Sequence, residues 1–90
     1  MIFSFNDDSL GRHNISHKEV FEALEDPFKI EAEVGEHQGN PTSIWIGKTF
    51  TERMLEIGVE YLEDCNHIYH TNKARKQYIS KYSQGKYYND

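Results

Sequence analysis

Histidines and basic side chains are the groups through which this 90-residue sequence could do chemistry. Residues 72–77 read Asn-Lys-Ala-Arg-Lys-Gln, Arg12 and His13 are adjacent near the start, and Arg53 lies mid-chain. Cationic side chains can hold phosphates, and an imidazole beside them can move protons while the cations stabilise a pentavalent phosphorane. These residue types therefore allow RNA cleavage without a metal ion. The alternative is a basic helix that is merely solvated or paired with an acidic partner.

The charge of the chain is divided unevenly along its length. Residues 1–64 carry five Lys or Arg and 14 Asp or Glu, a balance of −9, whereas residues 65–86 carry five Lys or Arg and no acid, a balance of +5. Asp90 brings the total to −5. This asymmetry predicts a basic face on an acidic body. It also fits two halves that attract each other within the fold, or two copies that pair head to tail as a homodimer.

The motifs do not favour metal or cofactor chemistry. His13 and His17 are four residues apart, and His67 and His70 are three apart. The second pair falls in an expected strand, where a spacing of three puts the rings on opposite faces. Cys65 is the sole cysteine, and no HExxH, GxSxG or phosphate-binding glycine loop is present. The sequence therefore predicts no metal site and no cofactor.

A helix is expected over residues 16–25. Ser16 followed by Glu19 forms the capping-box pattern of a helix start. Asp26 before Pro27 ends the helix, because the residue before a proline is pushed out of the helical conformation.

A second helix is expected over residues 73–83, capped by Thr71 or Asn72. Its basic side chains would face solvent. The residues expected to face a sheet are Ala74, Tyr78 and Tyr82.

Alternating apolar residues predict strands at 1–5, 28–34, 43–47, 54–62 and 67–70, with a loop at 35–41. The glutamates that alternate along these strands predict an acidic, solvated face. We therefore expect an α+β fold, with an antiparallel sheet of about four to five strands, one helix in the N-terminal half and one C-terminal helix. Residues 1–84 would form one domain and 85–90 a frayed tail.

The start of the chain has no basic region followed by an apolar stretch, and no apolar run approaches the length of a membrane span. These features favour a cytoplasmic protein without a membrane partner.

Several stretches, in the same order, resemble the BrnT toxins of bacterial type II toxin–antitoxin systems. That family has a His-containing stretch before a helix ending in Asp-Pro, an Ile-Gly step, a hydrophobic strand with Arg, and Ile-Ser-Ala-Arg-Lys-Ala leading into a basic helix that ends in Tyr. The matching stretches, spread over residues 1–82, are Arg12-His13-Asn14-Ile15-Ser16, Asp26-Pro27, Trp45-Ile46-Gly47, Arg53-Met54-Leu55-Glu56-Ile57, Ile68-Tyr69-His70-Thr71-Asn72-Lys73-Ala74 and the helix to Tyr82.

This resemblance implies a RelE-like fold, RNA cleavage that inhibits translation, and neutralisation by a cognate antitoxin protein. By position it implies catalytic roles for His13, Arg53 and Lys73. The residues that we expect to bind RNA lie in the basic stretches and are Arg12, Asn72, Arg75, Lys76 and Lys81.

The chain also departs from the family pattern. The segment between the first strand and His13 is shorter, which favours the loss of a helix there. Asn72 stands where the family has an Arg, and Glu63-Asp64 lies where the family has a basic residue. The alternative function is therefore that of a catalytically inactive relative acting as a protein-interaction or regulatory module.

Overall fold

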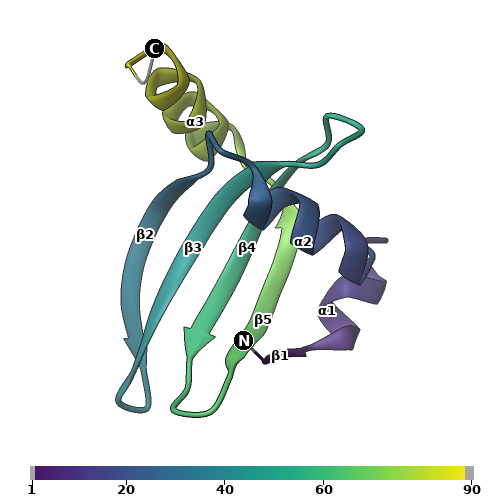
Figure 1. Cartoon of the computed structure of the whole chain (residues 1–90), viewed down its shortest axis with the longest axis vertical. Coiled ribbons are helices and arrows are strands. Elements are labelled where there is room, and N and C mark those ends of the chain that lie inside the picture. Colours follow the sequence, from purple (N-terminus) through teal and green to yellow (C-terminus); the bar gives the residue numbers. More distant parts are fainter. Residues whose placement is uncertain (1, 89–90) are drawn as a thin grey trace.

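A five-stranded sheet runs through the molecule, and three helices pack against it (Figure 1). The computed structural model describes the backbone of residues 2–88 and the side chains of residues 2–83. In chain order the elements are β1 (Phe3–Phe5), α1 (Asp7–Arg12), α2 (His17–Glu25), β2 (Ile30–His37), β3 (Asn40–Lys48), β4 (Met54–Tyr61), β5 (Asn66–Lys73) and α3 (Lys76–Tyr88).

The strands lie side by side in the order β1-β5-β4-β3-β2. From β2 to β5, each strand pairs antiparallel with the next, as the hairpin connections predict. β1 pairs in parallel with β5, with Phe3 opposite Asn66. The α+β class is confirmed, but the sheet is mixed, because β1 and β5 are joined by the rest of the chain and not by a hairpin. The RelE-like label stays a prediction.

Helix α2 begins and ends where the local sequence predicts. The Ser16 hydroxyl accepts a hydrogen bond from the Glu19 backbone N–H (3.1 Å), and the Glu19 carboxylate accepts one from the Ser16 N–H (3.0 Å), which completes the capping box. The helix stops at Glu25, just before Asp26 and Pro27.

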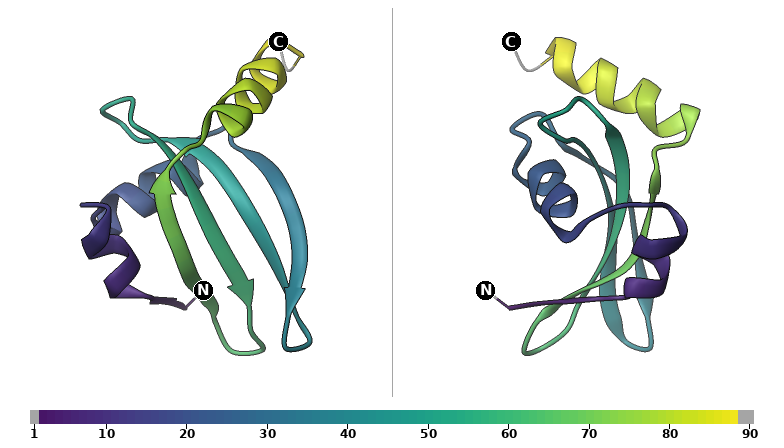
Figure 2. Two further views of the ribbon diagram at one scale, coloured as in Figure 1. Left: turned by 180° about the vertical axis from the view of Figure 1, so that it is seen from behind. Right: turned by 90° about the vertical axis from the view of Figure 1, so that its right-hand side faces the viewer.

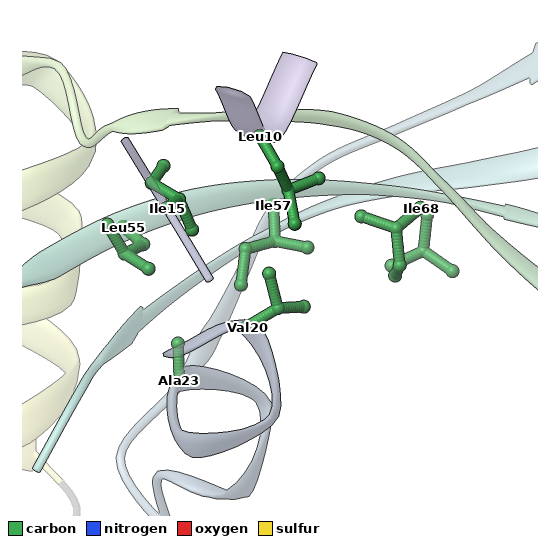
Figure 3. Packing of buried hydrophobic residues seen from close by; sticks show 8 residues of the cluster. Leu10, Ile15, Val20, Ala23, Leu55, Ile57 and Ile68 are labelled. Atoms are coloured by element: carbon green, nitrogen blue, oxygen red, sulfur yellow. The ribbon is translucent and has the colours of Figure 1, made fainter. Parts of the chain in front are cut away.

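The larger apolar core lies between α2 and the sheet face that it covers, and Leu10 of α1 joins it from the β5 edge of the sheet (Figures 1 and 3). Leu55, Ile57 and Val59 alternate along β4 and point toward Val20 and Ala23 of α2. The full set of buried residues in this cluster is Leu10, Ile15, Val20, Ala23, Leu55, Ile57, Val59 and Ile68.

A second, smaller core holds α3 to the opposite face of the sheet. Helix α3 starts on the side away from α2 and crosses over the end of the sheet (Figure 2). Tyr78 and Tyr82 are 1% and 3% exposed, and they pack with Ile46 of β3 and with Ala74. The prediction that Ala74, Tyr78 and Tyr82 face the sheet is confirmed.

The short helix α1 departs from the expectation that no helix lies between the first strand and His13. Six residues are too few for a periodic apolar pattern, so tertiary contacts decide the matter. Ser9 and Leu10 are buried against the rest of the fold, and Asp7 and Asp8 in the first turn suit the positive end of the helix dipole.

The loop expected over residues 35–41 is mostly strand. β2 continues to His37 and β3 starts at Asn40, so that only Gln38 and Gly39 form the turn. Both residues have positive φ (51° and 85°), the backbone conformation that a tight two-residue hairpin requires.

The helix expected over residues 73–83 begins later, at Lys76. Thr71 and Asn72 are not its caps, because they pair with Ile57 and Glu56 as part of a longer β5. The backbone of α3 runs to Tyr88, where a frayed tail was expected, and residues 89–90 lie outside the described residues. No helix in the described part of the chain combines the length and the apolar character needed to cross a membrane.

Candidate functional site

The sheet face that carries α3 also carries most of the titratable groups of β4 and β5. We call it the polar face. By register and contact it bears Glu56, Glu60, His67, Tyr69, His70 and Asn72. The acidic residues here were expected to be solvated, yet Glu56 is 0% and Glu60 8% exposed. That expectation is wrong for these two residues, because His70 and Arg75 bind the Glu56 carboxylate and His37 and Asn40 bind that of Glu60.

A β-bulge brings two of the histidines to this face. Gly58 pairs with His70 and Glu60 with His67, and the register shifts between them. Since Gly58 and Glu60 point to the same side of β4, their partners do too. The prediction that His67 and His70 lie on opposite faces is therefore wrong, because the bulge adds one residue to β5.

The buried carboxylate of Glu56 holds an imidazole and a guanidinium together. Its Oε2 lies 2.9 Å from His70 Nε2, and its Oε1 accepts hydrogen bonds from Arg75 Nε (3.1 Å) and the Arg75 backbone N–H (3.0 Å). Arg75 Nη2 also donates to the Tyr78 hydroxyl (3.1 Å), and the guanidinium lies over the Tyr78 ring. We call Glu56, His70, Arg75 and Tyr78 the Glu56 cluster.

The electrostatics of the Glu56 cluster favour the ionised carboxylate. Burial alone would raise the pKa of the Glu56 carboxyl, but the hydrogen bonds from His70 and Arg75 outweigh it, and the pKa lies below its ordinary value of 4.5. The same carboxylate raises the pKa of Arg75. Burial and a hydrogen bond to Glu33 raise the pKa of Tyr78, so that its hydroxyl stays neutral.

The side chains of His70 and Arg75 reach solvent, although the Glu56 carboxylate that binds them is buried. The side chain of His70 is 34% exposed and that of Arg75 is 54% exposed, against 1% for Glu56. With Nε2 engaged by Glu56, the imidazole of His70 keeps Nδ1 for another partner. Lys76 is exposed immediately after Arg75, and Asn72 lies beside Glu56 by register. An oriented imidazole thus sits next to cations on one exposed surface.

The residues that the resemblance implied as catalytic gather elsewhere. Arg53 donates to the backbone carbonyls of Asn14 (2.8 Å) and His13 (3.0 Å) and pairs with Glu19 (3.1 Å). Its guanidinium therefore fastens the α1–α2 connection to β4. Lys73 is exposed at the end of β5, and its Cα pairs with Leu55.

The sheet separates these residues from the basic helix. Ile15, two residues after His13, packs on the face to which Leu55 points, whereas Arg75 binds Glu56, which points to the other face. Of the predicted RNA-binding residues, Asn72 belongs to β5, Arg75 to the connection between β5 and α3, and Lys76 and Lys81 to α3, with Lys81 Nζ near the Ala32 carbonyl (3.4 Å). Arg12 lies in α1, and its Nε donates to the Asp8 carbonyl.

A pocket of ≈ 500 Å³ opens near the hairpin end of the polar face. Glu60 lies in it, and its Oε2 accepts hydrogen bonds from His37 Nδ1 and Asn40 Nδ2, each at 3.2 Å. The bond from His37 lowers the pKa of the Glu60 carboxyl. The lining residues are Glu36, His37, Thr42, Glu60, His67 and Tyr69.

Sequence reasoning did not select Glu56, His70 or the pocket residues. The signal that could have found them is the spacing of Glu56, Gly58 and Glu60, which places two carboxylates on one side of β4. Among the described residues, no group of three His, Cys, Asp or Glu side chains is arranged to hold a metal ion.

No protein-family model matches the chain, and a search of curated proteins found no match. The geometry of the polar face is therefore what supports a function.

Proposed function

We propose that the chain is a metal-independent endoribonuclease in which His70 is the acid–base group and Arg75 the phosphate-binding group. The observation that supports this most is the Glu56 carboxylate, which orients both side chains from a buried position while their outer atoms stay exposed. The RNA substrate, a BrnT-like toxin role in the cytoplasm and neutralisation by a cognate antitoxin are parts of this proposal.

The chemistry uses side chains of the polar face and a proton from solvent. The Nε2–H of His70 donates to Glu56, which leaves the Nδ1 lone pair free to take the proton of an RNA 2′-hydroxyl. The 2′-oxygen forms a bond to the adjacent phosphorus, the bond from phosphorus to the 5′-oxygen breaks, and that oxygen takes a proton from solvent. Arg75 stabilises the charge that develops on the phosphoryl oxygens.

Other residues near Arg75 would help to bind the RNA. Lys76 and Lys81 add positive charge near Arg75, Asn72 adds a neutral amide, and all three would contact the RNA backbone. His13 and Arg53 would take no part in the chemistry, because Arg53 is engaged on the α2 side of the sheet. The catalytic residues proposed from the structure thus differ from those that the resemblance implies.

Cleavage of single-stranded RNA by purified variants tests the proposal. We expect His70→Gln to cleave about 10²- to 10⁴-fold more slowly than the wild type. Arg75→Lys keeps the charge but loses the forked geometry, and it should lose about 10²-fold or more. His17→Gln is the matched control: its ring is exposed and bound to Asp7, and we expect unchanged cleavage.

Two outcomes would reject this assignment. Wild-type protein that leaves RNA intact would reject the enzyme altogether. Loss of cleavage in His13→Gln with full cleavage in His70→Gln would return the chemistry to the residue that the sequence favoured. Circular dichroism of every variant separates a lost fold from a lost active site.

A regulatory interaction module is the second candidate, because several large apolar side chains are exposed. Ile2 is 68% exposed and Val34, on the edge strand β2, is 74% exposed. Such surfaces suit a protein partner or a second copy of the chain. Normal bacterial growth and intact RNA on induced expression, together with a dimer in sedimentation experiments, would favour this module over the nuclease.

A further inference from the structure

The pocket beside the Glu56 cluster has the features of a nucleobase site. It lies on the same face of the sheet, and Glu60 and Glu56 are four residues apart on β4, or about 13 Å at roughly 3.3 Å per residue. A single-stranded segment bound at one end can therefore reach the other. The volume of ≈ 500 Å³ falls within the range of roughly 300–1,000 Å³ that small-molecule pockets occupy.

Tyr69 forms an aromatic platform in this pocket. Its ring lies against Gly58, where an added Cβ would be 2.7 Å from Tyr69 Cζ. Its hydroxyl is hydrogen-bonded to Thr42 on β3. The ring thus reaches from β5 over β4 to β3, and only a glycine at position 58 leaves room for it. A ring laid across a sheet in this way offers a stacking surface to an unpaired base.

Glu60 supplies a fixed acceptor at the same place. His37 and Asn40 both donate to Oε2, which orients the carboxylate, and none of the described residues donates a hydrogen bond to Oε1. The side chain is 11% exposed, so that a ligand bound to Oε1 would be largely shielded from competing water. A carboxylate of this kind selects a partner with N–H donors.

The fixed charge of the pocket argues against a phosphate there. Glu36 and Glu60 are its acids, and His37 and His67 are imidazoles that balance them only when protonated. A neutral base with donors on its edge fits this environment better than an anion does. Among the four RNA bases, guanine presents two adjacent donors, N1–H and N2–H₂, whereas adenine and cytosine place an acceptor nitrogen beside their amino group.

We infer that this pocket is a guanine-binding subsite, with the base stacked on Tyr69 and its donor edge on Glu60, so that RNA is cut close to a guanosine. The inference rests on the proposed nuclease function for its role, but binding of the base can be measured without cleavage.

The test is calorimetric titration of the full chain with nucleosides, which carry no phosphate. Guanosine should bind about tenfold or more tightly than adenosine, and inosine, which lacks the 2-amino group, should bind with intermediate affinity. Glu60→Gln should abolish the preference for guanosine over adenosine. Glu63→Gln is the matched control, since Glu63 is exposed outside the pocket, and it should keep the full preference.

Equal affinity for guanosine, inosine and adenosine, or no binding of any of them, would overturn the inference. Because this comparison uses the wild type, it stands even where Glu60→Gln does not fold. These experiments distinguish a failure of the nuclease proposal from a failure of the guanine subsite. Guanosine binding retained in His70→Gln, with cleavage lost, supports both. Binding without any wild-type cleavage rejects the nuclease alone, and cleavage without base preference rejects the subsite alone.

Discussion

At the scale of single residues, Glu56 determines the arrangement of the polar face. A buried carboxylate is costly unless its oxygens are hydrogen-bonded, and here three donors from two residues satisfy them. Burial raises the pKa of the Glu56 carboxyl and these hydrogen bonds lower it, and the net result is a lowered pKa. One side chain thereby orients His70 and also ties the start of α3, through Arg75, to the middle of the sheet.

Replacing Glu56 should therefore cost stability. Glu56→Gln keeps the size of the side chain but removes the charge that Arg75 faces. We expect a loss of about 3 kcal/mol in the free energy of unfolding, measured by urea titration at neutral pH. Glu63→Gln, an exposed glutamate, is the control and should change that free energy by less than about 0.5 kcal/mol.

The same residue predicts a pH dependence of stability. The pKa of Glu56 is lower in the folded chain than its ordinary value of 4.5. Its contribution is therefore complete above that value, and it is lost as the pH falls through the folded-state pKa. The stability difference between wild type and Glu56→Gln should shrink in acid. A difference that stays constant down to the acid transition would contradict the assigned electrostatics.

At the scale of elements, α2 lies very close to β3 at Gly47. A Cβ added at Gly47 would lie 2.0 Å from the Ala23 carbonyl oxygen and 2.8 Å from its carbonyl carbon. Both atoms belong to the helix backbone, so no side-chain rotation could relieve the overlap. The missing side chain at position 47 thus sets how close α2 lies to the sheet.

Gly47→Ala should accordingly destabilise the fold by about 1–3 kcal/mol or more, because α2 must move away from β3. Gly11→Ala is the control, since an added Cβ in α1 meets nothing within 4 Å. Alanine there should stabilise the chain by about 0.5–1 kcal/mol through its higher helix propensity. Thermal unfolding of both variants checks the prediction, and an unchanged midpoint for Gly47→Ala would contradict the close packing.

At the scale of the whole molecule, the sheet separates two sides that carry different groups. The α1–α2 side holds the larger core, and Arg53 fastens it by hydrogen bonds to two backbone carbonyls and an ion pair with Glu19. The opposite side holds α3, the Glu56 cluster and the pocket. Arg53 therefore joins the connection between α1 and α2 to the start of β4.

Arg53→Ala should loosen the α1–α2 side by about 1–2 kcal/mol, because a partly buried charge pair and two bonds to carbonyls are lost. Hydrogen exchange should speed up at the amides of Val20 and Ala23 more than in α3. Arg12→Ala, whose Nε contacts the Asp8 carbonyl within the same helix, is the control. Faster exchange confined to α3 would contradict this role.

Much of the fold could be predicted from local pattern, and much of the candidate site could not. The capping box at Ser16 and the sheet-facing Tyr78 and Tyr82 depend on interactions that short spacings encode. Helix α1 could not be predicted from local pattern, because it is stabilised by the burial of Ser9 and Leu10. The position of His70 could not be predicted either. Its spacing of three from His67 predicts opposite faces of the sheet, but the bulge places both side chains on the same face.

The sequence by itself determined the antiparallel meander, α2 and the apolar face of α3, since hydrophobic alternation and capping act between residues close together in the chain. Only the tertiary structure decided which imidazole shares a buried carboxylate with Arg75. That choice depends on strand register and on the desolvation of Glu56, both of which arise between residues 14 to 19 positions apart and across a bulge.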